Sequence, residues 1–359
     1  MITIILYILL IVLILMYISS IRKTEEFINY RHCDKYEISN RLKNIFKKYK
    51  INKSNKNWNL YLPCGYTNVE NELKKLEKIN KNQYVFAIDG CDKIVSKKYL
   101  WYTLKNKYGE SYTRYMPKTY DFDKKSIDYL IDNHKNNKKY IVKRDIQQQK
   151  GLTIVTDPNE LTKFKKKNEN IIIQELLTNP FTINGHKINL RIYLLIICVG
   201  NSIKSYIHEN GFVYYAPKKF NENSNERDVH ITTGYIDRKI YEKNPLSIDD
   251  FKMYLYKNNY DYKYFSNKLT QFFIELMESI KIPICNNKKF KKGTLYQLFG
   301  CDIALDTNLN LKIMEINKGP DLNSKSIRDS QIKDEVVSDL FSTLKLVNIN
   351  KRNRFIKIN

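Results

Sequence analysis

The sequence predicts an α+β protein with more than one lobe. Residues 299–317 show two alternating strands joined by a polar turn, and residues 187–197 form one long alternating strand. Residues 265–280 repeat apolar side chains at the spacing of an amphipathic helix. The chain has 359 residues, which is enough for two or three domains and a sizeable core.

The two predicted strands of residues 299–317 carry acidic side chains on one face. If Asp306 pairs with Leu311, Asp302 lies directly opposite Glu315. Two carboxylates facing each other across a ladder repel, which favours a cation between them. Asn317 adds a neutral oxygen to the same face. Two carboxylates and an amide oxygen suit a hard cation such as Mg²⁺, whose remaining ligands are water and phosphate. The alternative is an edge hairpin with solvated acids.

Three further stretches suggest a site for an anion or a nucleotide. Residues 140–155 read as a strand ending at Lys143, a polar loop with Lys150 and Gly151, and a second strand. Lysines and backbone amides in such a loop can cover a triphosphate, although an ordinary basic hairpin is the alternative. Residues 171–177 predict a buried strand whose end can present backbone groups to an adenine edge, or can simply pack in the core.

The long strand over residues 187–197 places polar and apolar side chains on opposite faces. Lys187, Asn189 and Arg191 share one face, and leucine and isoleucine occupy the other. Central strands seldom bury unpaired charge, and arginine can bind phosphate with two hydrogen bonds. The pattern therefore favours an anionic ligand on this face.

Residues 1–21 carry no charge and are almost wholly apolar. This length spans a bilayer as a helix, and Arg22 and Lys23 predict that the following part faces the cytosol. A cleaved signal peptide is the alternative. We therefore expect a single-pass membrane protein with an anchor over residues 1–21 and a basic helix and linker over residues 22–60.

The formal net charge is +24, from 62 Lys and Arg against 38 Asp and Glu. Such a charge attracts acidic partners, although compositional drift toward lysine is the alternative explanation. No RNP-like or zinc-finger pattern is present, so we expect no nucleic-acid partner. The six cysteines are scattered without a CxxC pair, which predicts neither a zinc site nor a disulfide framework and favours a reducing compartment.

Several motifs occur together in one order: SKKYLWYTL, YIVKRDIQQQKGLTI, NPFTINGHKINLRIYLLI and FGCDIALDTNLNLKIMEIN. Over about residues 84–347 they resemble the tubulin–tyrosine ligase-like family of the ATP-grasp fold. The resemblance implies antiparallel sheets flanked by helices, with ATP between two lobes. The implied organisation is an N-terminal lobe at 61–120, a central lobe at 121–185, a C-terminal lobe at 186–347 and a basic, frayed tail at 348–359.

The resemblance also implies roles for individual residues. ATP binding falls to Lys143, Lys150, Gly151, Gln174, Glu175, Leu176, Leu177, Lys187 and Arg191, of which Lys187 and Arg191 would also be catalytic. Mg²⁺ would be held by Asp302, Glu315 and Asn317, and substrate by Asn189, His230, Thr232 and Thr233.

The implied reaction ligates glutamate, glycine or tyrosine to a protein carboxylate through an acyl phosphate. A tubulin-like acidic tail is a possible acceptor. Three positions depart from the family pattern: Asn189 replaces Asp, Tyr214 replaces Arg and Thr233 replaces Asn. These departures affect the substrate side more than the phosphate and metal side. The alternatives are another ATP-grasp peptide ligase and a membrane-anchored ATP-binding pseudoenzyme.

Overall fold

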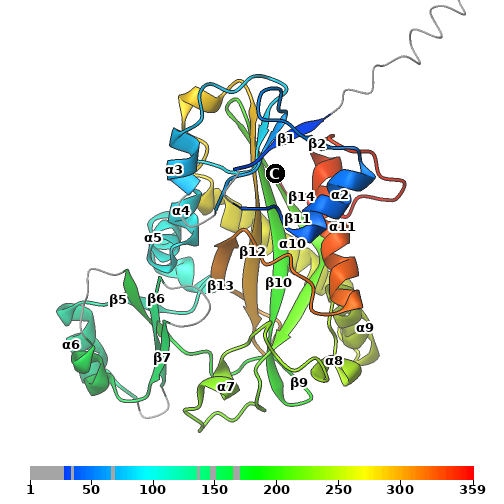
Figure 1. Cartoon of the computed structure of the whole chain (residues 1–359). Coiled ribbons are helices and arrows are strands. Elements are labelled where there is room, and N and C mark those ends of the chain that lie inside the picture. Colours follow the sequence, from blue (N-terminus) through cyan, green and yellow to red (C-terminus); the bar gives the residue numbers. More distant parts are fainter. Residues whose placement is uncertain (1–27, 34–35, 66–68, 136–137, 146–150, 165–169) are drawn as a thin grey trace, which may run out of the picture.

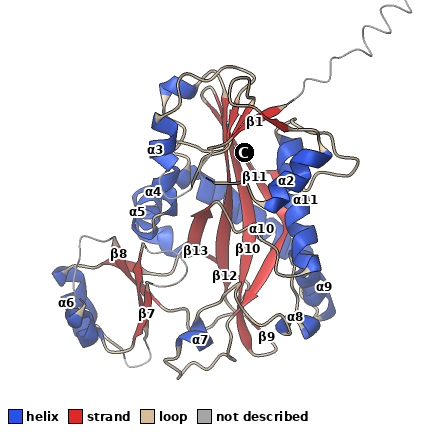
Figure 2. Cartoon of the chain, in the orientation of Figure 1, coloured by secondary structure: helices blue, strands red, loops and turns tan. Residues whose placement is uncertain are grey.

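The computed structural model describes residues 28–359 except 34–35, 66–68, 136–137, 146–150 and 165–169. The described chain forms one large sheet and one small sheet, with helices packed around both (Figures 1 and 2). The predicted anchor, residues 1–21, lies outside the described residues. Among the residues that are described, no helix is both long enough and apolar enough to span a bilayer.

The large sheet has the order β14-β11-β10-β12-β4-β3-β1-β2, with β13 paired to β12 and β9 paired to β10. Its strands are β1 (Asn29–Arg31), β2 (Asn52–Lys53), β3 (Leu60–Tyr61), β4 (Tyr84–Val85), β9 (Thr182–Ile183), β10 (His186–Val199), β11 (Ser202–Tyr215), β12 (Thr294–Leu305), β13 (Leu311–Lys318) and β14 (Phe355–Lys357). The resemblance implies antiparallel sheets, whereas this sheet is mixed. Four neighbouring pairs are parallel: β2 with β1, β1 with β3, β3 with β4, and β4 with β12. The other pairings are antiparallel.

The small sheet is antiparallel, with the order β5-β8-β6-β7. Its strands are β5 (Thr119–Asp121), β6 (Tyr140–Arg144), β7 (Leu152–Val155) and β8 (Ile171–Glu175). It has its own apolar core, which includes Phe122, Tyr140 and Ile173, separate from the main core. Figure 1 shows the small sheet with α6 beside the lower part of the large sheet.

The helices are α2 (Asn40–Lys48), α3 (Val69–Lys74), α4 (Cys91–Val95), α5 (Lys97–Tyr108), α6 (Lys124–Asp132), α7 (Arg227–His230), α8 (Ile240–Lys243), α9 (Ile248–Lys257), α10 (Tyr262–Ile280) and α11 (Ile327–Thr343). Three short 3₁₀ helices are η1 (Gly109–Arg114), η2 (Pro158–Lys163) and η3 (Lys288–Phe290). The predicted apolar face of residues 265–280 is confirmed, because Phe265, Phe273 and Leu276 of α10 are fully buried. Burial of such a stripe supplies most of the stability of a helix in a folded protein.

The structure corrects the expectation for the cysteines. Disulfides join Cys33 to Cys64 and Cys198 to Cys285, with Cα–Cα distances of 5.2 and 6.2 Å. Cys91 and Cys301 are buried free thiols. The paired cysteines are 31 and 87 residues apart, so no local spacing rule reveals them. Cysteine usage therefore gives no support for a reducing compartment.

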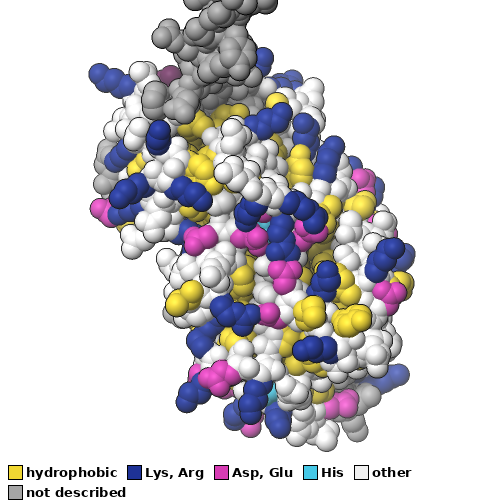
Figure 3. All heavy atoms as spheres, turned by 90° about the vertical axis from the view of Figure 1, so that its right-hand side faces the viewer, with side chains coloured by type: hydrophobic (Ala, Val, Ile, Leu, Met, Phe, Trp, Pro, Cys, Tyr) yellow, Lys and Arg dark blue, Asp and Glu magenta, His cyan; other side chains and the backbone are white. Residues whose placement is uncertain are grey.

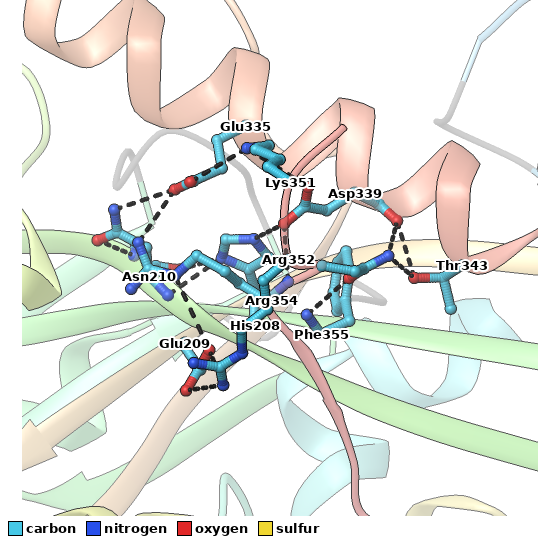
Figure 4. Close-up of polar contacts among 12 residues, drawn as sticks. His208, Glu209, Asn210, Glu335, Asp339, Thr343, Lys351, Arg352, Arg354 and Phe355 are labelled. Atoms are coloured by element: carbon cyan, nitrogen blue, oxygen red, sulfur yellow. Dashed lines mark hydrogen bonds and ion pairs between the residues drawn. The ribbon is translucent and has the colours of Figure 1, made fainter. Parts of the chain in front are cut away.

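The C-terminal tail is ordered by pairing and not frayed as expected. β14 pairs with β11, and Figure 4 shows the polar contacts that hold the residues around it. The ring of His208 is fully buried and contacts the backbone oxygen of Asn210 and the carboxylate of Asp339. Asp339 also accepts a hydrogen bond from the backbone of Arg354 at 2.9 Å. These contacts tie the tail to α11 and β11.

The Arg354 guanidinium adds ion pairs to this arrangement. It donates two hydrogen bonds to Asp249, at 2.7 and 2.8 Å, and one to Glu335 at 3.2 Å. Its side chain is 23% exposed, whereas that of Arg352, which pairs with Glu209, is 76% exposed. Figure 3 shows this face of the molecule with basic and acidic side chains interleaved.

We predict that Arg354→Met lowers the free energy of unfolding by about 1–3 kcal/mol, because it removes a partly buried guanidinium that hydrogen-bonds Asp249 and Glu335 together. Arg352→Met, the matched control, should cost less than about 1 kcal/mol, because its ion pair is exposed. Denaturant unfolding of the two variants measures both. Equal losses would show that the tail is not held by the Arg354 network.

Candidate functional site

A partly open cavity lies between the two sheets. Its lining comes from β6, β7, the end of β8, β10, the region around α7, and the β12–β13 pair, with one residue from α5. The lining residues are Lys97, Ile141, Lys143, Leu152, Glu175, Leu176, Leu177, Lys187, Asn189, His230, Ile231, Thr232, Asp302, Met314 and Glu315. Ten of the residues predicted for ATP, Mg²⁺ or substrate are thus brought to one cavity.

Two lysines give this cavity its electrostatic character. Lys143 on β6 and Lys187 on β10 are 5% and 3% exposed, and neither forms an ion pair with a carboxylate of the described residues. Burial lowers the pKa of Lys143 to about 7, with a smaller contribution from Lys97, and burial lowers the pKa of Lys187 to about 8. Unpaired buried ammonium groups are unfavourable, so a polyanion in the cavity would stabilise both.

The carboxylates of Asp302 and Glu315 face each other, as the sequence predicted. The route to this register differs from the expectation, because Leu311 pairs with Leu305 and not with Asp306. A bulge at Met314 then shifts the ladder by one residue and restores the opposition of Asp302 and Glu315. The pairing that places the two acids together is therefore confirmed, and the assumed turn register is wrong.

Side chains already supply cations beside both acids. The Arg191 guanidinium donates to the two oxygens of Asp302 at 2.6 and 2.9 Å, and the Lys97 ammonium lies 3.6 Å from an oxygen of Glu315. Gly300 leaves the space that Arg191 needs, since a Cβ there would lie 3.0 Å from the arginine side chain. Repulsion between the acids is thus reduced without a metal.

The two acids differ in proton affinity. Burial raises the pKa of Asp302 to about 6, although Arg191 opposes the shift. Burial acts in the same direction on Glu315, but Lys97 and a hydrogen bond from Asn317 outweigh it and lower the pKa of Glu315 to about 2. Both groups are therefore predominantly ionised at neutral pH and can act as oxygen ligands.

The donor set fits Mg²⁺ as part of a shared shell. The described residues contain no cluster of three His, Cys, Asp or Glu side chains able to hold a metal ion. Asp302 and Glu315 would supply two oxygens, and phosphate and water the others, which is the usual arrangement for Mg²⁺. Asn317 donates its amide to Glu315 at 2.9 Å, so it positions this carboxylate, and its role as a ligand stays a prediction.

A second cavity adjoins the first and shares Asp302, Glu315 and Thr232 with it. Arg191, Asn317 and Thr233 line this second cavity only, so the predicted site residues fall on two sides of the carboxylate pair. Tyr214 also lines it and places its ring 5.1 Å from the Arg191 guanidinium. The departures from the family pattern at positions 214 and 233 thus lie together, in the second cavity, while Asn189 lines the first.

Besides Arg191, three predicted nucleotide residues do not line the first cavity. Gln174 turns its amide to the Thr119 hydroxyl at 2.8 Å inside the small sheet. Gly151 is buried and accepts a backbone hydrogen bond from Arg144. Lys150 lies outside the described residues. The Gln174 side chain thus lies within the small sheet, and the role of this strand end in nucleotide binding stays a prediction.

Lys97 is the functional residue that sequence reasoning missed. It begins α5 after Ser96, whose hydroxyl caps the helix. Acidic side chains are the favourable ones in the first turn of a helix, and α5 has none there. A lysine at this position is a weak signal, because α6 also begins with two lysines, Lys124 and Lys125, and both are exposed.

The family model for the tubulin-tyrosine ligase family matches residues 74–354, which is more than half of the chain.

The chain belongs to the tubulin-tyrosine ligase family.

Within this family, similar proteins include the tubulin polyglutamylases TTLL6 of Mus musculus and Homo sapiens. The mouse protein is 25% identical over 61% of this chain and 28% of its own length, and the human protein is 24% identical over 81% and 34%. The probable alpha-tubulin polyglutamylase Ttll1 of Tetrahymena thermophila is 26% identical over 64% of this chain and 60% of its own length. The chain therefore spans between 28% and 60% of the length of these relatives.

The buried lysines predict how stability depends on pH in this member of the family. An unfolded lysine titrates near 10.5, so between about pH 7 and pH 10 the unfolded chain binds more protons than the native state. The apo protein should therefore become more stable as the pH rises from 7 to 9. Lys143→Met should raise its melting temperature at pH 7 and flatten this rise.

Thermal unfolding of the apo protein at several pH values measures the effect, with the exposed Lys135→Met as a control that should follow the parent protein. A large loss of stability in Lys143→Met would mean that Lys143 makes a structural ion pair.

Proposed function

We propose that the chain is an ATP-dependent ligase that joins an amino acid to a carboxylate of an acidic protein. One observation carries the proposal. Lys143 and Lys187, buried and without a carboxylate partner in the described chain, share a cavity with the facing pair Asp302 and Glu315. The two lysines can neutralise phosphate, and the two carboxylates can bind a metal ion. A Mg²⁺–triphosphate requires this combination of charges in its binding site.

The residues divide the work by position. Lys143 and Lys187 neutralise phosphate charge, while the apolar side chains of Ile141, Leu152 and Met314 exclude water from the same cavity. Such preorganised charges in a water-poor site stabilise developing charge strongly. When bound, ATP supplies a phosphoryl group that converts a carboxylate into an acyl phosphate, which an amine can attack.

The second cavity suits the reacting carboxylate and the incoming amine. Arg191 lies on the boundary between the two cavities, beside Asp302, and so can contact an anionic group from the second cavity. Lys325 lines the same cavity. We therefore assign the amino acid and the acceptor to this side, and the nucleotide to the first cavity.

Glutamate is the amino acid we favour, because the similar proteins are named as tubulin polyglutamylases. Glycine and tyrosine are the alternatives, and an acidic tail such as that of tubulin is the acceptor class that the charge of +24 suits. The second candidate function is an ATP-binding protein without turnover, which Asn189, Tyr214 and Thr233 motivate. ATP hydrolysis that depends on an added acceptor separates the two.

A screen with radiolabelled amino acids and acidic acceptor peptides tests the proposed reaction. We expect incorporation that requires ATP and Mg²⁺. Glu315→Gln should lower it by at least about 100-fold, because it removes one of two charged ligands. The exposed Glu77→Gln should retain the parent rate. Full activity of Glu315→Gln would exclude the metal role of this hairpin.

We also propose that residues 1–21 anchor the protein in a membrane as a single-pass segment, with the ligase part facing the cytosol. The support is the charge-free apolar sequence followed by Arg22 and Lys23. Alkaline carbonate extraction of membranes should leave the full-length chain in the pellet. Release of the full-length chain to the supernatant would contradict the anchor.

A further inference from the structure

The register of the large sheet brings the beginnings of several strands to one end of the molecule. Tyr30 of β1 pairs with Leu60, Leu60 with Tyr84, and Tyr84 with Thr294, in parallel. Thr294 also pairs with Val199, at the tip of the β10–β11 hairpin. The loops that precede these strands therefore share one end of the sheet, which lies at the top of Figure 1.

We name this end the basic pole and define it by residues 52–59, 78–83, 199–203 and 286–293. Direct contacts hold its loops together. The amide of Gln83 donates to the backbone oxygen of Trp58 at 3.2 Å, and the backbone of Thr294 donates to that of Gln83 at 2.9 Å. Lys291 donates to Asn201 at the hairpin tip. The loops form one continuous surface and not four separate tips.

The charge of this surface is entirely of one sign. Its four segments contain eight lysines and no aspartate or glutamate. All eight lysines are exposed: Lys53, Lys56, Lys78, Lys81, Lys288, Lys289, Lys291 and Lys292. The face drawn in Figure 3 differs, because acidic partners are interleaved with its basic side chains across α9, α11 and the C-terminal tail.

An apolar side chain and an aromatic side chain sit among these lysines. Val199 at the hairpin tip is 44% exposed, and the partly exposed Trp58 lies just before β3. Proteins that bind the interface of a bilayer typically present lysines together with tryptophan and aliphatic side chains. A surface that binds only a soluble acidic protein would not require the exposed side chains of Val199 and Trp58.

The position of the basic pole also favours a bilayer. The described chain enters the sheet at this pole, because β1 begins at Asn29. Six residues separate the apolar sequence of residues 1–21 from residue 28, and such a segment can extend at most about 20 Å. Asp302 lies eight residues along β12 from Thr294, a distance of about 26 Å. The basic pole therefore lies close to the predicted anchor and away from the candidate active site.

We propose that the basic pole is a docking surface for the headgroups of anionic lipids, which holds the domain against the membrane with the ligase site turned away from it. Each exposed lysine close to a negatively charged bilayer adds attraction that is lost beyond about 8–10 Å at physiological salt. The orientation of the domain thus depends on the lipid composition. The proposal rests on the membrane anchor proposed above for residues 1–21 and is independent of ligase activity.

Lysine footprinting of the full chain in vesicles tests the proposal. The protein is placed in vesicles of phosphatidylcholine alone and of equal parts phosphatidylcholine and phosphatidylserine, then treated with a membrane-impermeant acylating reagent. An attraction of about 1 kcal/mol per lysine corresponds to roughly fivefold weaker labelling of the lysines of the basic pole in the vesicles that contain phosphatidylserine. High salt should restore the labelling. Lys239 and Lys243, exposed near α8 at the far end of the molecule, should react equally in both.

A pair of charge-reversal variants separates local from general effects. Lys288→Glu combined with Lys289→Glu should abolish the protection of Lys78 and Lys81, because the common surface loses its attraction. Lys239→Glu combined with Lys243→Glu, the same charge change elsewhere, should preserve it. Thermal unfolding of both variants checks their folding, and the comparison of the two vesicle types with the parent chain needs neither variant.

Two results would overturn the proposal. Equal labelling of the pole lysines in the two kinds of vesicle would show that the pole does not dock on anionic lipid. Protection by a soluble polyglutamate peptide, without protection by phosphatidylserine, would assign the pole to an acidic protein partner instead.

Discussion

The structure depends on burying opposite charges in register on three neighbouring strands. Arg191, Asp302 and Glu315 occupy adjacent positions on β10, β12 and β13, and Lys97 approaches from α5. Removing each charge from water costs several kcal/mol unless its partner is in place. A slip of one residue in any of these strands would turn its charged side chain to the opposite face of the sheet. The pairing of the buried charges therefore fixes the register of the central sheet, and that register in turn places the charges of the site.

Periodicity in the sequence predicted the faces of these strands correctly. Lys187, Asn189 and Arg191 share a face, and Asp302 opposes Glu315, because side chains alternate with a period of two in any strand. The turn was the weak point. Pairing of Asp306 with Leu311 was assumed, whereas Leu305 pairs with Leu311 and the bulge at Met314 compensates. A bulge has no clear signature in one sequence. The opposition of Asp302 and Glu315 was therefore predicted correctly from an incorrect pairing at the turn.

Contacts between residues far apart in the chain were not predictable in this way. Arg191 and Asp302 are 111 residues apart, and Cys198 and Cys285 are 87 apart. The parallel entry of β4 beside β12 and the return of β14 to β11 are equally remote in sequence. Local patterns report the face and type of an element, but the packing of the whole chain decides which faces meet. The resemblance to a family supplied the site residues that periodicity could not, and Lys97 escaped both.

The small sheet has an apolar core of its own, and this separation has a mechanical consequence. Polar contacts join it to its neighbours: Asp145 accepts from Ser96, Asp121 accepts from Tyr102 and pairs with Lys98, and Lys139 donates to the backbone of Ser224. A unit with its own core can shift relative to its neighbours, although here Ile172 of β8 packs in the main core and such a shift would have to break some of these contacts. Rotation of β6 would carry Lys143 toward or away from Asp302 and Glu315, so the spacing of cations and carboxylates becomes an adjustable quantity.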